Sequence, residues 1–194
     1  MITAKEVKSL RDRTGASMMQ CKKALEESSG NLEEAIKVLQ KSGTKVADKK
    51  CGRGMAEGCI GSYVHGNGKV GVLVEIICET DFVARNEEFK EFAHDLAMHI
   101  AAVSPKYIDY SEIASEEMKS KKEEITEEVK KENKPADIAE KIVEGKVKKH
   151  FDEICLLNQQ FVKNPDFTIE QLITEKIAKL GENIKVENII RFEI

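Results

Sequence analysis

Cysteine and histidine are the residues of this 194-residue chain that could serve as nucleophiles or as metal ligands. The five cysteines form no CxxC pair, and their number is odd: Cys21, Cys51, Cys59, Cys78 and Cys155. A zinc site usually takes about four nitrogen or sulfur ligands in closely spaced pairs, and a disulfide framework is usually even in number and denser. The spacing therefore indicates reduced thiols in a reducing compartment and no bound metal.

The four histidines are scattered along the chain: His65, His94, His99 and His150. Cys78 could pair with His65 as an activated nucleophile, but nothing in the sequence indicates a third residue to orient the histidine. The patterns GxxxxGK[ST], GxSxG and HExxH do not occur. Gly66-Asn67-Gly68 resembles the first half of a dinucleotide-binding turn, but a strand is expected after it, not a helix. We therefore expect no active site, no cofactor and no nucleotide bound by this chain itself.

Two adjacent methionines, Met18 and Met19, are the notable feature near the N-terminus. Neighbouring positions on a helix point about 100° apart, so the two side chains cannot both face the same core. Methionine is unbranched and adapts to a partner's shape. With Arg11 and Lys22 nearby, the pair suggests an apolar spot rimmed by positive charge. Spacing alone favours the simpler alternative, in which the segment is core of a helix bundle.

A second notable feature is Phe82, which falls where an expected strand ends and an expected helix begins. In one alternative Phe82 fills the core, and Asp81 or Thr80 caps the helix. In the other it projects outward as an exposed aromatic wedge. The local pattern leaves both alternatives open.

Capping-box spacing marks the helices that carry the first feature. Thr3 with Glu6, and Ser17 with Gln20, have the spacing in which two side chains satisfy the free N–H groups of a helix start. Together with a third helix, these predict a small three-helix bundle.

The third helix is expected to begin after Asn31 and to stop at Gly43. Residues 44–56 have no apolar periodicity, so we expect a linker there. The N-terminal domain is therefore predicted to span residues 1–43.

Alternation of apolar residues predicts the strands that precede and support the second feature. It is strict over residues 70–78, and residues 58–65 form a second candidate across the Gly-Asn-Gly turn at 66–68. The C-terminal residues 185–194 alternate again and could add a third strand. We expect an α+β core domain over residues 57–194, with a three-stranded antiparallel sheet covered by helices.

Helical spacing predicts the elements that cover this sheet. Residues 86–103 are expected to form one helix. Residues 111–149 are strongly charged and are expected to form an exposed helix packed along one side, with a second helix opening at Pro135. Further helices are expected over residues 151–161 and 168–180.

Charge and composition limit the kinds of partner. The chain is 34% charged with a net charge of −4, yet residues 1–56 carry 12 basic and 7 acidic side chains. This mild excess is weak evidence for an acidic partner surface and poor evidence for nucleic acid, which usually selects a strong basic stripe. No run approaches the ~20 apolar residues of a membrane span. We therefore expect a soluble, cytoplasmic protein with no membrane contact.

Four stretches, in order along the chain, resemble signature regions of the elongation factor Ts family. They are TGASMMQCKKAL (14–25), TDFVARNEEF (80–89), CLLNQQFVKNPDFTIEQLI (155–173) and KLGENIKVENIIRFE (179–193). The resemblance implies an N-terminal domain of ubiquitin-associated type, followed by a core with an antiparallel sheet. It also implies a function, which is to bind the GTPase elongation factor Tu and promote release of its GDP. The chain has room for one core module, so it resembles the short members that pair as homodimers.

The resemblance also implies residue roles. Phe82 would insert next to the magnesium site of the GTPase, and Asp81 would hold the turn or contact the partner, flanked by Thr80 and Val83. A second surface would grip a helix of the GTPase near its guanine-binding end; its residues would be Arg11, Met18, Met19 and Lys22.

Three other functions are compatible with parts of the sequence. The chain could be a general adaptor, with a helical module on a dimerising core. It could bind nucleic acid through the basic residues of 45–53, although the acidic remainder opposes this. It could be an enzyme, although the absent motifs argue against that.

Overall fold

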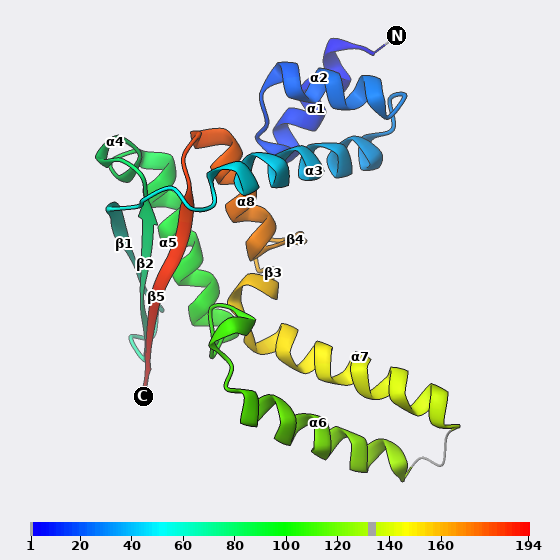
Figure 1. Ribbon diagram of the computed structural model, residues 1–194. Coiled ribbons are helices and arrows are strands. Elements are labelled where there is room, and N and C mark those ends of the chain that lie inside the picture. The colour runs from blue at the N-terminus through cyan, green and yellow to red at the C-terminus, as the bar shows by residue number, and fades with distance from the viewer. Residues whose placement is uncertain (1, 132–134) are drawn as a thin grey trace.

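The computed structural model describes residues 2–131 and 135–194. Met1, and residues 132–134 within the expected charged stretch, lie outside the described residues. An N-terminal group of helices, a sheet with its covering helices, and a projecting helical hairpin follow one another along the chain (Figure 1). The mixed α+β class and the three-stranded antiparallel sheet expected from the sequence are confirmed. No helix among the described residues is long and apolar enough to cross a membrane.

Three helices form the N-terminal bundle: α1 (Ala4–Thr14), α2 (Met18–Glu27) and α3 (Leu32–Lys50). Both expected capping boxes are present, at Thr3 with Glu6 and at Ser17 with Gln20. The bundle buries its own small apolar cluster, which includes Val7, Leu10, Cys21, Ala24, Leu25 and Ala35. The label of ubiquitin-associated type stays a prediction.

The expected end of the third helix at Gly43 is wrong, because α3 continues to Lys50. Gly43 is buried, and a β-carbon there would lie 3.3 Å from the Thr174 methyl group on α8 (Ile169–Leu180). The glycine therefore permits close packing of two helices and does not act as a stop signal. The first half of the expected linker 44–56 is helical. The division into domains at these residues stays a prediction.

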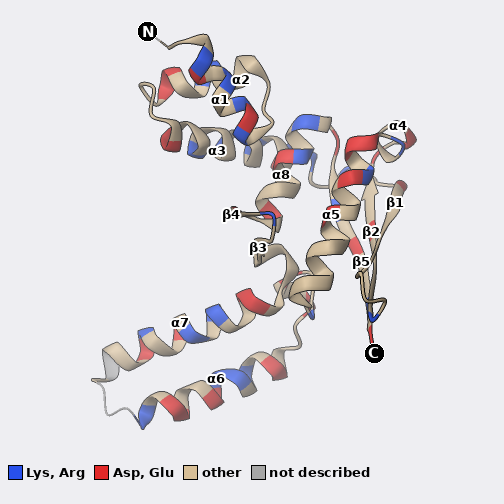
Figure 2. Ribbon diagram, turned by 180° about the vertical axis from the view of Figure 1, so that it is seen from behind, with Lys and Arg blue, Asp and Glu red and all other residues tan. Residues whose placement is uncertain are grey.

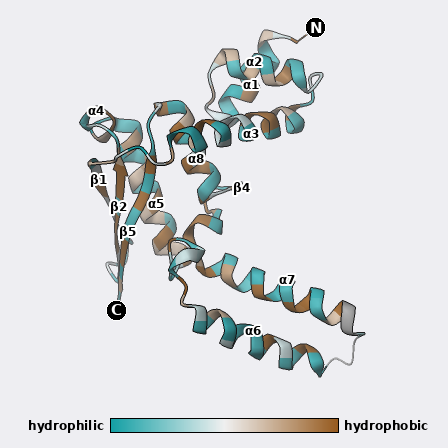
Figure 3. Ribbon diagram, viewed as in Figure 1, coloured by the Kyte–Doolittle hydropathy of each residue, from teal (hydrophilic) through white to brown (hydrophobic). Residues whose placement is uncertain are grey.

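The sheet has the order β1-β2-β5, with β1 (Glu57–Val64), β2 (Val70–Cys78) and β5 (Ile184–Glu193), all antiparallel. The expected hairpin and terminal strand are confirmed. Figure 3 shows the apolar character of β2, whose alternate side chains are buried: Val72, Val74, Ile76 and Cys78.

Helix α5 (Glu87–Val103) packs on that buried face of the sheet with four large side chains: Phe89, Phe92, Leu96 and Ile100. Helix α8 joins the same core through Ile169, Ile173 and Ile177. The Glu88 carboxylate on α5 accepts from Lys176 at 2.7 Å and from Lys179 at 2.6 Å, which ties the two helices together. The other face of the sheet has no covering helix in the described part of the chain (Figures 1 and 2).

A helical hairpin projects from the core: η1 (Tyr110–Glu112) leads into α6 (Ser115–Lys130), which packs on α7 (Ala136–Ile154). Acidic and basic residues alternate along both helices (Figure 2). The two helices share a narrow apolar seam that contains Ile125, Val129 and Val143. The expected exposed, one-sided helix and the second helix after Pro135 are therefore confirmed.

The expected separate helix over residues 151–161 is wrong. Helix α7 ends at Ile154, and the chain continues as η2 (Leu156–Asn158), β3 (Gln160–Phe161) and β4 (Asn164–Thr168). The backbone leaves the helix because Leu156 N–H donates to the Tyr107 carbonyl at 2.9 Å, so the chain bonds to a distant segment and not to its own preceding turn. The capping box of Thr168 with Gln171 then starts α8 as expected.

Candidate functional site

Phe82 lies at the exposed corner where β2 passes into α5. It belongs to a one-turn helix, α4 (Asp81–Ala84), and its side chain is 84% exposed. The next two residues, Val83 and Ala84, are buried in the core of the sheet domain. The turn is therefore anchored by its second half while the aromatic ring points to solvent. Of the two alternatives open from the sequence, the outward one is correct.

The polar residues before Phe82 are not helix caps. Thr80 occupies the N-cap position of α4, but its side chain makes no capping bond. The following helix α5 is capped instead by Asn86, whose side chain accepts from Glu88 N–H at 2.8 Å. The Asp81 carboxylate pairs with the Arg85 guanidinium at 3.1 Å. This pair is exposed, so it contributes little stability and leaves Asp81 available to a partner.

Two carboxylates from distant parts of the sequence hold the corner. Both the backbone N–H and the hydroxyl of Thr80 donate to the Glu182 carboxylate, at 3.0 Å and 2.6 Å. The Glu79 carboxylate accepts from Asn183 N–H at 2.6 Å and from Arg53 at 3.4 Å. The Asn183 hydrogen bond is the main cause that lowers the pKa of Glu79.

Local sequence patterns do not indicate a role for Glu182, although the register of the strands does. Because β2 and β5 pair with Cys78 opposite Ile184, extending the same register by two residues places Thr80 opposite Glu182. Strand pairing, and not local spacing, carries this information.

The methionine pair near the N-terminus also faces outward. Met19 is 76% exposed and Met18 is 43% exposed, while Cys21 on the same helix is fully buried. Arg11 and Lys22 are exposed beside them, and Lys22 lies 3.9 Å from Glu26. The simpler alternative, in which this segment is only bundle core, is therefore wrong for the two methionines, although Cys21 does lie in that core. Figure 1 shows α4 and the α1–α2 pair at the same end of the molecule, separated by α3 and α8.

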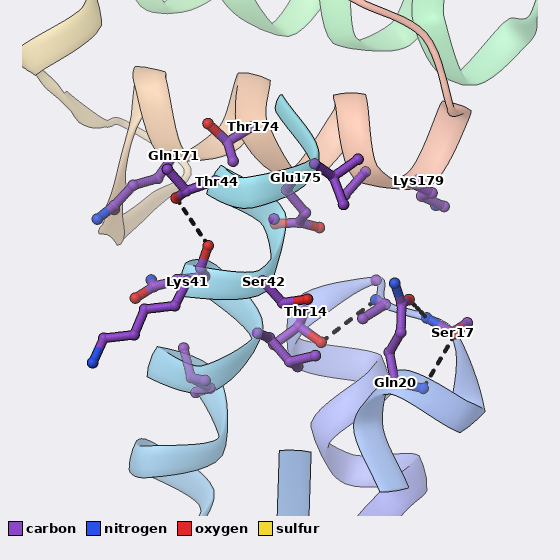
Figure 4. Close-up of a pocket in the computed structure, with 18 of the residues that line it drawn as sticks. Thr14, Ser17, Gln20, Lys41, Ser42, Thr44, Gln171, Thr174, Glu175 and Lys179 are labelled. Atoms are coloured by element: carbon purple, nitrogen blue, oxygen red, sulfur yellow. Dashed lines mark hydrogen bonds between the residues drawn. The ribbon is translucent and has the colours of Figure 1, made fainter. Parts of the chain in front are cut away.

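A groove of about 1060 Å³ separates the N-terminal bundle from α8. Figure 4 shows Thr14, Ser17 and Gln20 on the bundle side, and Thr174 and Glu175 on the α8 side. Arg11 and Met18 line its rim. Burial raises the pKa of Glu175 to about 7, opposed by the charges of Lys176 and Lys179 on its own helix.

The cysteines and histidines do not assemble into a catalytic or metal site in the described residues. Cys78 and His65 lie at opposite ends of the β1–β2 hairpin, because Cys78 pairs with Glu57 and His65 follows Val64. Burial raises the pKa of Cys78 to about 11, which leaves its thiol protonated and a poor nucleophile. No group of three or more potential ligands could hold a metal ion among the described residues.

The glycines around the β1–β2 turn do not form a nucleotide site. Gly66, Gly68 and Gly71 together complete the GxGxxG spacing. They lie in the hairpin turn and at the start of β2, so no helix N-terminus follows to receive a phosphate.

Comparison with known proteins supports one family. A family model described as elongation factor TS matches residues 2–194. The chain is 52% identical to elongation factor Ts of Carboxydothermus hydrogenoformans, over 100% of this chain and 89% of that protein. It is also 52% identical to elongation factor Ts of Thermosipho melanesiensis, over 100% of this chain and 99% of that protein. Since both the family match and the relatives extend over essentially its whole length, this chain belongs to the elongation factor Ts family.

Proposed function

We propose that this protein binds elongation factor Tu and promotes release of its GDP during translation elongation, in the cytoplasm. The observation that carries the proposal is the exposed ring of Phe82, held outward by a turn whose neighbouring residues are buried. A large aromatic side chain that contributes nothing to its own core is typical of a contact residue for another protein.

Exchange of this kind needs no bond chemistry, only a difference in affinity. If the factor weakens GDP binding by some ratio, GDP weakens factor binding by the same ratio. Burying one phenylalanine gains about 1.5–3 kcal/mol. That is comparable to one charge-assisted hydrogen bond between the GTPase and its nucleotide. Insertion of Phe82 near the magnesium site can therefore offset the loss of such a contact.

The second surface supplies affinity in this proposal. Met18 and Met19 form an exposed, adaptable apolar spot, and Arg11 and Lys22 rim it with positive charge. Contacts at the Phe82 turn and at the methionine surface let the factor act on the nucleotide pocket of the GTPase from two sides. Thr80, Asp81 and Val83 form the turn that carries Phe82.

The deciding measurement is GDP release from elongation factor Tu, followed with increasing concentrations of this protein. We expect Phe82→Ala to lower the maximal stimulated rate far more than it raises the concentration for half-maximal effect. Met19→Ala should show the opposite pattern. Ile138→Ala, which truncates an exposed side chain on the remote helix α7, serves as the control.

An unchanged maximal rate with Phe82→Ala would reject the wedge role. A wild-type protein that binds the GTPase but leaves GDP release at its spontaneous rate would favour the adaptor function instead.

The open face of the sheet supports a further part of the proposal, that two copies pair through their cores. Five apolar side chains point away from α5, and each is between 44% and 69% exposed: Ile60, Val64, Leu73, Ile190 and Phe192. An apolar surface of this kind is uncommon on a monomer and is typical of an interface. Because all five side chains lie on one face of one sheet, two copies can bury them symmetrically against each other.

A further inference from the structure

The ring of Phe82 is 84% exposed, so packing does little to fix its direction. Helix α4 is only four residues long, and so short a helix has no stability of its own. Val83 and Ala84 anchor the C-terminal side of the turn by burial. On the N-terminal side the buried Cys78 anchors the end of β2, but Thr80 and Asp81 beyond it are only half-buried and need polar contacts to fix them.

The Cys78 thiol donates to the Thr80 carbonyl at 3.3 Å, and the Glu182 carboxylate holds the N–H and the hydroxyl of the same residue. One carboxylate oxygen accepts the Thr80 N–H at 3.0 Å, and the other accepts the Thr80 hydroxyl at 2.6 Å. Thr80 is thereby fixed at both its backbone and its side chain, two residues before Phe82. Bonds to an ionised acceptor are shorter and about twice as strong as neutral ones.

A second carboxylate completes the link in the opposite direction. Glu79 accepts from Asn183 N–H at 2.6 Å, so each of the two segments gives one carboxylate to the other. The hydrogen-bonded pairing of β2 with β5 stops at Cys78 and Ile184. Beyond this pair, the segment after β2 turns into α4, and the segment before β5 comes from α8. These side chains replace the ladder where the two backbones diverge.

We propose that Glu182 is a positioning residue for nucleotide exchange, holding Thr80 so that Phe82 is presented in one fixed direction. The inference rests on the proposed role of Phe82. A contact group that is already oriented avoids the entropy cost of being ordered when the partner binds. Loss of Glu182 should therefore affect exchange without unfolding the protein, because the core beneath the turn is untouched.

The first test measures the hold on residue 82 without any GTPase. The chain contains no tryptophan, so Phe82→Trp introduces a single indole at this position. Time-resolved fluorescence anisotropy then reports its nanosecond motion. We expect Glu182→Ala in this background to increase the amplitude of the fast decay. The matched control is Glu187→Gln, which alters an exposed carboxylate of β5 that pairs with Lys185. An identical decay in the Glu182→Ala and control proteins would overturn the proposal.

The second test measures stimulated GDP release with Phe82 restored. We expect Glu182→Ala to lower the maximal rate by about tenfold, with little change in the concentration for half-maximal effect. Glu182→Gln keeps one acceptor oxygen, so its maximal rate should lie between those of the wild type and Glu182→Ala. Thr80→Val should resemble Glu182→Ala in direction, and Thr80→Ser, which keeps the hydroxyl, should restore the rate. A role in stability alone would lower the unfolding midpoint of the variants and leave the maximal rate of the folded protein unchanged.

The two tests separate the possible failures. If the wild type does not stimulate GDP release, the proposed function fails. If it does but Phe82→Ala leaves the stimulated rate unchanged, the wedge role of Phe82 fails, and with it any role of Glu182 in exchange through that ring, whatever the anisotropy shows. If Phe82→Ala slows release but Glu182→Ala does not, only the positioning role is overturned. Far-UV circular dichroism and the unfolding midpoint of each variant establish that it is folded before either comparison is made.

Discussion

Among single residues, Glu175 has an environment that conflicts with its charge. Its carboxyl lies in the groove between α8 and the bundle, where a β-carbon on Gly15 would come within 2.9 Å of one of its oxygens. Burial raises its pKa to about 7, and the repulsion from Glu88 adds to the shift. Lys176 and Lys179 oppose it, but both of these lysines already pair with Glu88. The ionised carboxylate is therefore poorly compensated.

This conflict predicts a pH-dependent stability. The folded-state pKa of Glu175 lies above its ordinary value of 4.5. The stability that its protonated carboxyl contributes is therefore fully present below about pH 4.5 and is lost as the pH rises through 7. Glu175→Gln should therefore be more stable than the wild type at pH 8, because glutamine carries no charge. The gain should be at most about 2 kcal/mol, because the groove leaves the carboxyl partly solvated.

Urea unfolding at pH 5 and pH 8 measures this difference. The gain should shrink toward pH 5. Glu170→Gln, an exposed position on the same helix, is the control and should show no such trend. An equal effect of Glu175→Gln at both values would contradict the prediction.

The direction of single side chains was only partly predictable from the sequence. The alternation of β2 predicted its buried residues, because a strand has a fixed period. Phe82 stayed ambiguous because its direction depends on the one-turn helix α4, for which four residues give no periodic signal. The partner of Thr80 was missed because Glu182 is 102 positions away in the chain.

At the scale of elements, β1 and α5 approach each other closely in the core. Gly61 faces the α5 backbone, and a β-carbon there would lie 2.4 Å from the Ala93 carbonyl oxygen and 2.5 Å from its carbon. These are backbone atoms of a central helix, so they cannot move aside as a flexible side chain could. The glycine sets the distance between the sheet and its covering helix.

Gly61→Ala should therefore destabilise the protein by at least about 2 kcal/mol, since relief of the clash requires the strand or helix to shift. Gly66→Ala, in the turn between β1 and β2, is the control, because no atom outside its chain neighbours lies within 4 Å of a β-carbon at that position. Chemical denaturation of both variants gives the comparison. Equal midpoints for the two would show that the sheet and α5 can separate at little cost.

Element starts were more predictable than element ends. Every helix start with a capping box is where the sequence indicates it, because the cap is a local interaction between residues three apart. The ends of α3 and α7 were misjudged. Helix α3 continues past Gly43 because the glycine permits contact with α8. Helix α7 ends at Ile154 because Leu156 bonds to Tyr107. Both are tertiary contacts, which local sequence patterns do not contain.

At the scale of the whole molecule, the open face of the sheet predicts an oligomer. Its apolar side chains lie opposite the face covered by α5. If two copies bury this face, a charge placed in its centre loses water without gaining a partner, which is costly.

Leu73→Asp combined with Phe192→Asp should therefore convert a dimer to a monomer in sedimentation velocity experiments, with the fold retained. Ile138→Asp, on the projecting hairpin, should leave the dimer intact. A wild-type protein that sediments as a monomer at high micromolar concentration would reject the pairing.

The unbroken course of α3 also has a mechanical consequence. This helix packs in the bundle at its beginning and on α8 beyond Gly43, and its 19 residues span about 28 Å as one rod. A break at Gly43 would have left the N-terminal bundle and the core joined by a flexible linker. With α3 as a rigid connection, the surface around Met19 and the ring of Phe82 are held at a set separation. If both contact elongation factor Tu as proposed, that separation restricts how the GTPase can bind.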